Sequence, residues 1–194
     1  LSQGQELVLT PRFSPTNQEI TYMSYTKDQP RVFIMNLETG KRELVGDFPN
    51  MTFAPRFSPD GATVVFSLSQ DGNTDLYSMQ LSSGQMTRLS NAPSIETAPS
   101  FSPDGLLIAY GNRGNSLHLL ERASITAEWK GPTRLLPPNG YAPRWSPDGG
   151  HLAFLADREP KGRKQLWIIP TSGVGGRNLQ HHVVRVEGVV AAHR

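Results

Sequence analysis

Pro55-Arg56-Phe57-Ser58-Pro59-Asp60-Gly61 is the stretch that decides the fold of this 194-residue chain. Closely similar stretches begin at three other prolines, and the four first residues, Pro11, Pro55, Pro99 and Pro143, lie 44 positions apart. A near-identical motif at one constant interval indicates an internal structural repeat. The chain is therefore expected to consist of about four similar 44-residue units.

Each motif is followed by two apolar runs rich in β-branched and aromatic residues, then by a short last run. In the second repeat these are Val64-Val65-Phe66, Leu76-Tyr77-Ser78-Met79 and, after a turn at Gly84, Met86–Leu89. Such runs, separated by Gly, Pro, Asp and Asn, are typical of antiparallel hairpins, and no segment has sustained helical periodicity. Four strands in a unit of about 40–50 residues predict a propeller blade. We therefore expect an all-β fold, a β-propeller built of four-stranded antiparallel blades.

The predicted domain organisation is a single, partial β-propeller domain over residues 1–194. The repeats are expected at approximately 7–50, 51–94, 95–138 and 139–182, with an incomplete next repeat over 183–194. The last strand of the fourth repeat is expected around Asn178-Leu179. A partial ring leaves two open blade edges, which invite pairing with another chain, so self-association through these edges is an expected interaction.

The motif residues have expected structural roles. Pro-Asp-Gly suits a tight turn, because Pro fixes φ and Gly accepts a positive φ. The repeated Asp60, Asp104 and Asp148 are interpreted as turn caps, since repetition across blades argues against catalysis. The aromatic residue of each motif is expected to wedge between adjacent blades as part of the core; these residues are Phe13, Phe57, Phe101 and Trp145.

Composition excludes several classes of protein. The chain has no cysteine, which removes disulfide scaffolds, thiolate zinc sites and thiol catalysis. It has no apolar run of about 18 residues, so no membrane insertion is expected. The net charge of +2 combines an acidic first part, 1–128, with a basic remainder, 129–194. The basic side chains are scattered and lack interleaved aromatics, so we interpret them as a solvated surface and expect no nucleic-acid partner.

No catalytic, cofactor-binding or metal-binding residues are predicted. The sequence has no Gly-x-Ser-x-Gly and no His-Glu-x-x-His motif, and Gly173–Gly176 lacks the Lys-Ser/Thr of a phosphate loop. Asp71–Asp75 resembles the start of a calcium loop but lacks its later Gly and Glu, so a hairpin turn is expected instead. His181-His182 would point to opposite sides of a strand, which disfavours a joint metal site. The chain is therefore predicted not to be an enzyme.

Within residues 1–105, three sequence segments are more distinctive than the repeated motif alone: Leu7–Pro15, Phe48–Pro59 and Gly72–Met79. Together with the repeated motif, they make this half of the chain resemble the TolB family of periplasmic propellers. The resemblance implies a six-bladed ring preceded by an α/β domain, of which this chain would be a part. It also implies a non-enzymatic, protein-binding role in the Tol–Pal envelope-integrity system, a periplasmic location, and as partners the peptidoglycan-associated lipoprotein and other Tol components.

The later repeats depart from that pattern. Ala123–Lys130 replaces a short turn, and the fourth repeat, Ala142–Arg177, is similar to the propellers of prolyl-oligopeptidase-type serine peptidases. The alternative function is therefore the non-catalytic propeller portion of such a peptidase. A third alternative is an array of propeller repeats with no native partner.

Strand order predicts where a partner would bind. The loops between the second and third strands, and those leading to the next blade, emerge on one face, opposite the Pro-Asp-Gly turns. Loops on a rigid scaffold are where binding concentrates. The candidate partner-binding residues on this face are the apolar or aromatic residues Phe48, Met51, Phe53, Ile95 and Tyr141. The alternative role for these five side chains is to cap the core between the blades.

Overall fold

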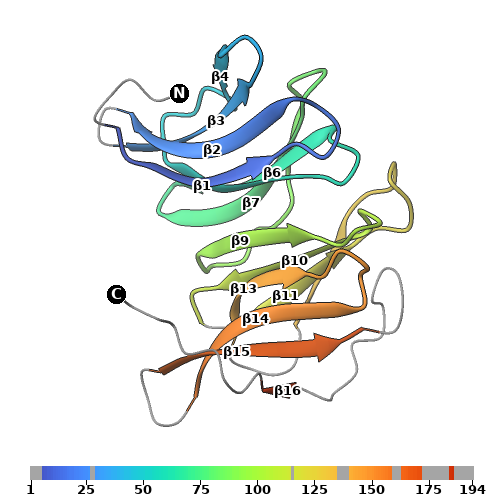
Figure 1. The fold of residues 1–194 in the computed structure, drawn as a ribbon. Helices are drawn as coiled ribbons and strands as arrows, with labels where there is room; N and C mark the ends of the chain where they lie inside the picture. Colours follow the sequence, from blue (N-terminus) through green and yellow to red (C-terminus); the bar gives the residue numbers. More distant parts are fainter. Residues whose placement is uncertain are drawn as a thin grey trace, which may run out of the picture.

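The computed structural model describes residues 6–26, 29–114, 116–134, 140–158, 163–171 and 184–185. These residues form sixteen strands in four sheets, each of four strands in antiparallel order (Figure 1). The predicted all-β fold of four-stranded antiparallel blades is confirmed. None of the described residues forms a helix that could cross a membrane.

The strands follow the chain order from the inside of each blade to the outside. Blade one contains β1 (Val8–Phe13), β2 (Glu19–Thr26), β3 (Gln29–Asn36) and β4 (Arg42–Leu44). Blade two contains β5 (Thr52–Phe57), β6 (Thr63–Gln70), β7 (Asn73–Gln80) and β8 (Met86–Arg88). Blade three contains β9 (Glu96–Phe101), β10 (Leu107–Asn112), β11 (Leu117–Glu121) and β12 (Lys130–Arg134). Blade four contains β13 (Tyr141–Trp145), β14 (His151–Arg158), β15 (Arg163–Pro170) and β16 (Val184–Arg185).

The last strand of blade four differs in position from the prediction. The expected Asn178-Leu179 lies outside the described residues, and β16 is the strand that pairs with β15, through Ile168 and Val184. These two residues of β16 fall within 183–194, the range predicted to start a further repeat. They complete blade four instead.

The β6–β7 hairpin shows why the blade strands are almost continuously apolar. It pairs from Thr63↔Gln80 to Gln70↔Asn73, with Asp71 and Gly72 at positive φ in a two-residue turn. This confirms the predicted hairpin at Asp71–Asp75. Along β6, Val64 and Phe66 pack toward blade one, whereas Val65 packs toward blade three. Because a neighbouring blade covers each face of the sheet, both sets of alternating side chains are buried.

Three clusters of apolar side chains form the core, one between each pair of neighbouring blades. The first joins Val32 of blade one to Phe66 of blade two, and the second joins Leu76 of blade two to Tyr110 of blade three. The third joins blade three to blade four. Three of the motif aromatics pack against these clusters, as predicted: Phe57, Phe101 and Trp145.

Phe13 does not follow that prediction, because 78% of its surface is exposed. It lies on the side of blade one that faces away from blade two, beside Ile20, its pairing partner in β2. Tyr22, Phe33 and Met35 form a small cluster on the same side. No described blade covers this side, so Phe13 lacks the neighbouring cluster that partly buries Phe57 in blade two.

The motif turns are capped by their aspartates. The Ser102 hydroxyl donates to Asp104 at 2.6 Å, and Asp104 accepts a second hydrogen bond from the Leu106 backbone N–H. Asp60 and Asp148 accept equivalent hydrogen bonds in blades two and four. The capping role of these three aspartates is confirmed.

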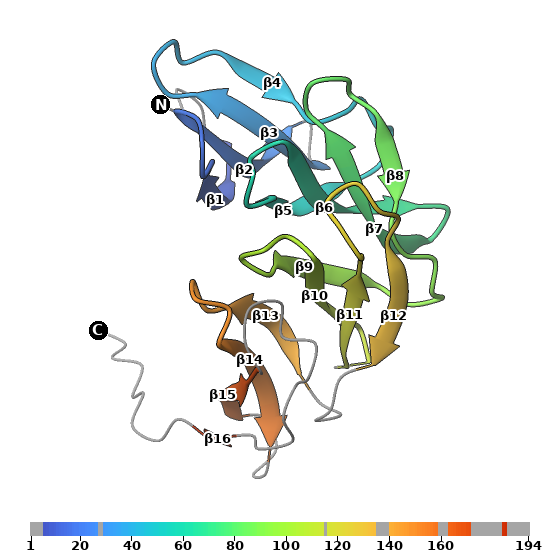
Figure 2. The same ribbon diagram turned by 90° about the vertical axis from the view of Figure 1, so that its right-hand side faces the viewer.

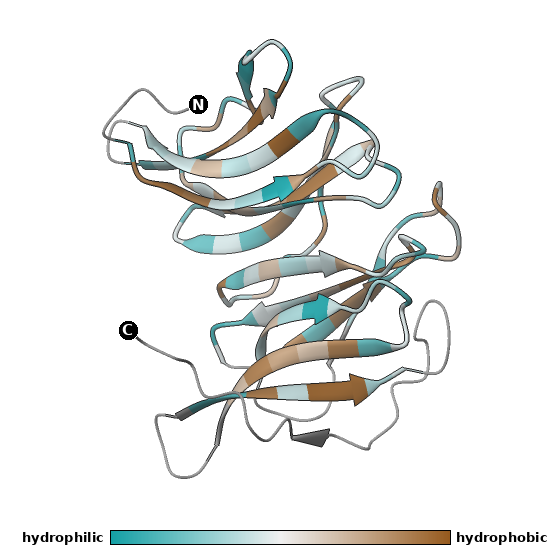
Figure 3. Cartoon of the chain, viewed as in Figure 1, coloured by the Kyte–Doolittle hydropathy of each residue, from teal (hydrophilic) through white to brown (hydrophobic). Residues whose placement is uncertain are grey.

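The four blades succeed one another along an arc, with blade one and blade four at its ends (Figure 2). The inner strands β1, β5, β9 and β13 contact one another in this order. Brown, apolar segments alternate along the strands of each blade, while the connections are mostly teal or white (Figure 3). The inner strands therefore form the wall of the arc, and the connections lie along the two rims of that wall.

Candidate functional site

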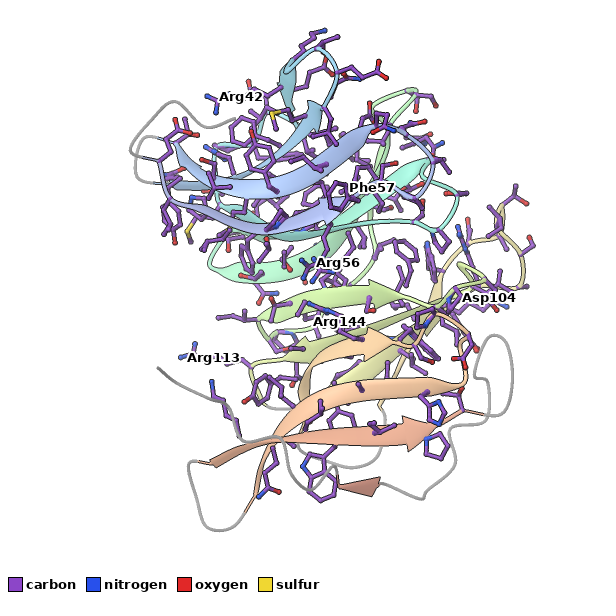
Figure 4. All side chains as sticks on the ribbon, in the orientation of Figure 1. Arg42, Arg56, Phe57, Asp104, Arg113 and Arg144 are labelled. Atoms are coloured by element: carbon purple, nitrogen blue, oxygen red, sulfur yellow. The ribbon has the colours of Figure 1, made fainter. Side chains whose placement is uncertain are left out.

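One end of the inner wall carries the connections that were predicted to bind a partner. We call it the loop face; among the described residues it consists of the β6–β7 connection, residues 113–114 and 116 of the β10–β11 connection, residues 45–51 before β5, residues 89–95 before β9 and Gly140 before β13, together with the strand ends next to them. In Figure 4, Arg113 of the β10–β11 connection marks the loop face, and Asp104 in the β9–β10 turn marks the opposite end. All five predicted binding residues belong to the loop face or to the strand positions next to it.

Phe48 is largely a core residue. Its ring centroid lies 5.9 Å from that of Phe66, and the side chain packs against the cluster between blades one and two. Gly46, at φ +69, leaves no room for a Cβ atom beside the Phe48 ring. For Phe48, the structure therefore favours the core-capping role over that of an exposed anchor.

The next three predicted residues differ in exposure. Met51, just before β5, is 44% exposed and offers a flexible apolar contact. Phe53 on β5 and Ile95 before β9 are half-buried. The Ile95 carbonyl accepts a hydrogen bond from the Arg113 N–H at 2.8 Å, so the backbone of this loop is held in place.

Tyr141, the first residue of β13, is half-buried at the loop face of blade four. The Lys164 ammonium of β15 lies 5.7 Å from its ring centroid, within the range of a cation–π contact. The Tyr141 backbone also lies against Gly111 of blade three. Tyr141 is thus a fixed part of the contact between blades three and four, with one ring face next to a cation.

Hydrogen bonds between neighbouring blades hold the loop face rigid. The Arg31 guanidinium donates to the carbonyl of Asn50, in the loop that leads from blade one into blade two. The Asn73 amide donates to the Ala92 carbonyl at 2.7 Å, one blade further along. In blades one and two, a residue at the end of the hairpin therefore holds the loop that leads into the next blade. A surface ordered in advance loses less conformational entropy when it binds.

A buried polar group lies between blades two and three near the same face. Asp75 of β7 pairs with Arg88 of β8 at 2.7 Å, and Glu96 of β9 is 1% exposed. Burial, and to a lesser degree the Asp75 charge, raise the pKa of Glu96 above its ordinary value. Burial and the neighbouring Glu96 carboxylate likewise raise the pKa of Tyr110. Asp75, Glu96 and Tyr110 thus form a buried polar contact between blades two and three, and Arg88 also lines a groove on the outside of blade two.

Three arginines line the inner wall. Arg12, Arg56 and Arg144 occupy equivalent positions on β1, β5 and β13, and Ser100 takes that position on β9. Arg56 and Arg144 lie at neighbouring points of the wall, between the loop face and the tight-turn end (Figure 4). We call these three residues the arginine cluster.

A repeated bulge precedes each of these positions. Thr10, Ala54, Ala98 and Ala142 have φ between 53° and 57°, and the strand register shifts at each of them. A β-bulge of this kind bends its strand and changes the direction of the side chains that follow. In the three arginine-bearing strands, Nη1 then donates to the preceding proline carbonyl, at 2.6 Å in Arg12 and Arg56 and 2.5 Å in Arg144.

The electrostatic environment of the arginine cluster is unfavourable for positive charge. Arg56 is 8% exposed. Burial, together with the nearby charges of Arg144 and Arg12, lowers the pKa of Arg56 to about 9. Burial and the Arg12 charge lower the pKa of Arg144 to about 10. Sequence reasoning missed this cluster, although Pro-Arg in three of the four motifs was a signal that could have revealed it.

A separate groove of about 630 Å³ lies away from the arginine cluster, between blade two and the Ala123–Lys130 stretch that departs from the repeat. Its walls are mainly polar, with Gln80 and Thr87 on one side and Trp129 on the other. The Arg122 guanidinium stacks over Trp129 at 4.5 Å from the ring centroid. The inserted segment is thus packed against its own blade.

Comparisons with known proteins point to one family. A family model for the TolB beta propeller domain matches residues 1–116. The Tol-Pal system protein TolB of Pelagibacter ubique (strain HTCC1062) is 65% identical over 54 residues, which make up 28% of this chain and 12% of that protein. The crystal structure of TolB from Acinetobacter baumannii matches with a TM-score of 0.70 and 26% identity, covering 87% of this chain and 45% of that one. The chain thus spans less than half the length of either relative.

A structure from a study of two prolyl endopeptidases also matches, with a TM-score of 0.61. It is 16% identical and covers 95% of this chain and 30% of that one. This likeness is one of fold alone. Sequence and structure together therefore favour the first family over the peptidase alternative.

Proposed function

This chain belongs to the TolB beta-propeller family, and we propose from this premise that its loop face binds a protein partner without catalysing a reaction. The proposed setting is the Tol–Pal system of the periplasm, and the proposed partners are the peptidoglycan-associated lipoprotein and other Tol components. The matched segment covers only 12% of the Tol-Pal relative. The proposed partners and location therefore rest on membership of the family, not on this segment.

The observation that carries the proposal is the rigid loop face. Interblade hydrogen bonds hold its backbone, and Met51 stands out from it as an exposed apolar side chain. A few well-placed apolar anchors commonly supply most of the affinity of an interface. Met51 is accordingly the proposed anchor, and Phe53, Ile95 and Tyr141 are proposed as further, half-buried contacts on the same face.

Binding of the purified chain to immobilised peptidoglycan-associated lipoprotein, measured by biolayer interferometry, tests this proposal. Met51→Lys is expected to weaken binding by about tenfold, because it places a charge within an apolar contact. Ile125→Lys is the matched control, since Ile125 is exposed to a similar degree, 47%, but lies beside the Gly105 turn at the opposite end of the wall. No binding by the folded wild-type chain, or equal losses in both variants, would refute the proposal.

A further inference from the structure

The arginine cluster carries positive charge that no described residue neutralises in an ion pair. Among the described residues, the ion pairs are Lys41–Glu43, Arg42–Glu6 and Arg88–Asp75, and none of them includes a member of the cluster. Arg56 is nevertheless buried. Buried charges in proteins are normally paired, because an uncompensated one is strongly destabilising. An anion supplied from outside the chain would remove that cost.

The guanidinium groups have donors to spare. An arginine carries five N–H donors in a planar fork. In Arg12 and Arg56 the only hydrogen bond to a described residue comes from Nη1, which donates to the preceding carbonyl. In Arg144, Nη1 also approaches the Ala98 carbonyl at 3.5 Å. Toward the described residues, the Nε and Nη2 sides make no hydrogen bond, and this is the edge with which arginine binds a carboxylate through two parallel hydrogen bonds.

Blade three contributes space instead of a fourth arginine. Ser100 is buried, and its hydroxyl accepts a hydrogen bond from the Trp145 backbone N–H at 3.3 Å. Because this side chain is short, the wall between Arg56 and Arg144 carries no long side chain at that position. Arg144 leans toward β9, as its approach to Ala98 shows. The two guanidinium groups therefore act on each other across blade three.

From these observations we propose that Arg12, Arg56 and Arg144 form a binding site for a carboxylate carried by an acidic peptide segment. The inference rests on the proposed function, because the segment would belong to the protein docked on the loop face. Thr52, at the loop-face end of β5, pairs with Leu68, and Arg56 pairs with Val65, so the bulge leaves three residue steps of β6 between them, a rise of roughly 10 Å at about 3.3 Å per residue. An extended acidic segment of about four residues spans this depth.

Titration calorimetry with a blocked tetraglutamate peptide tests the site. The wild-type chain is expected to bind this peptide and not the blocked tetraglutamine peptide of similar size. Arg56→Gln and Arg144→Gln should each weaken binding at least about tenfold, since each removes a charge-assisted, bidentate hydrogen bond to a peptide carboxylate. Arg113→Gln is the matched control, because Arg113 is exposed on the loop face outside the cluster, and it should change the affinity less than about twofold.

Two further measurements separate the alternatives. Arg56→Lys keeps the charge but loses the planar fork, so it should also weaken binding while the chain remains folded by circular dichroism. Inorganic phosphate is the competing small anion. Phosphate binding without tetraglutamate binding, equal binding of the two peptides, or unchanged affinity in both glutamine variants would each overturn the inference.

The outcomes also separate this inference from the proposed function. If the lipoprotein binds the wild-type chain and the Arg56→Gln/Arg144→Gln double variant equally, the arginine site is wrong and the loop-face proposal stands. If the lipoprotein does not bind but tetraglutamate binds in an arginine-dependent way, the loop-face partner is wrong and the carboxylate site stands.

Discussion

Arg88 Nη2 donates to Asp75 Oδ2 at 2.7 Å, joining the last two strands of blade two beside the interface with blade three. The Asp75 side chain is 5% exposed, whereas that of Arg88 is 48% exposed. Removal of the arginine would therefore leave a buried carboxylate without its cationic partner, with the Asn73 amide still donating to it at 3.3 Å.

We expect Arg88→Met to lower the free energy of unfolding by about 1–2 kcal/mol, less than for a fully buried pair because water screens half of Arg88. Adding Asp75→Asn should recover part of that loss, because the uncompensated charge is gone. Urea denaturation of both single variants and of the double variant gives the coupling energy, and strict additivity would contradict this account.

Glu96→Gln should stabilise the protein at neutral pH. Burial raises the folded-state pKa of Glu96 above its ordinary value of 4.5. The contribution of the protonated Glu96 side chain to folding stability is therefore fully present below about pH 4.5 and is lost as pH rises through the folded-state pKa. The variant should be more stable than the wild type by about 1 kcal/mol at pH 7, or roughly 2–4 °C in Tm, and nearly equal at pH 4. Thermal unfolding across this pH range measures the difference, and equal Tm values at pH 7 would count against the prediction.

Gly61 and Gly84 offer a matched pair of turn substitutions. Their φ values are +70° and +69°, so alanine suffers the same backbone strain at both, about 1–2 kcal/mol. At Gly61 an added Cβ would also collide with the Thr16 side chain of blade one, while nothing lies within 4 Å at Gly84. Gly61→Ala should therefore cost at least about 1 kcal/mol more than Gly84→Ala.

Thr16→Ala in the Gly61→Ala background should restore most of that extra loss, because it removes the colliding hydroxyl. Chemical denaturation of the three variants measures these terms. Equal losses of stability in Gly61→Ala and Gly84→Ala would show that Thr16 of blade one does not restrict the space at the blade two turn.

Phe57 and Phe13 test the same motif position in two environments. Phe57→Ala should cost about 2–4 kcal/mol, since the ring fills the interface between blades one and two. Phe13→Ala should change stability by less than about 0.5 kcal/mol, because the ring is 78% exposed. Sedimentation velocity provides a second readout, and loss of the Phe13 ring should reduce any self-association through the uncovered side of blade one.

The sequence predicts the blade because every signal for it is local. A motif, two apolar runs and a glycine turn recur within 44 residues, and each becomes a strand or turn in place. Whether an aromatic side chain of the motif is packed or exposed depends instead on the adjacent blade. Phe57 and Phe13 read alike in sequence, yet only Phe57 has a blade packed against it.

The candidate site was predictable only in part for the same reason. Strand order identifies the loop face, but exposure within it depends on packing, which places Phe48 in the core and leaves Met51 outside. The repeated Pro-Arg shows that Arg12, Arg56 and Arg144 share a motif position, but it does not show that their side chains face one another. Only the curvature of the arc brings Arg12, Arg56 and Arg144 onto one wall.

The three clusters between the blades make this chain a row of coupled units, in which stability arises mainly between neighbours rather than within a central core. Blades two and three each have two such neighbours, and blades one and four each have one among the described residues. Opening should therefore begin at the ends of the row, and amide hydrogens should exchange faster in β2 and β15 than in β6 and β10. Blade two, which carries Arg56, is therefore among the last parts of the chain to unfold.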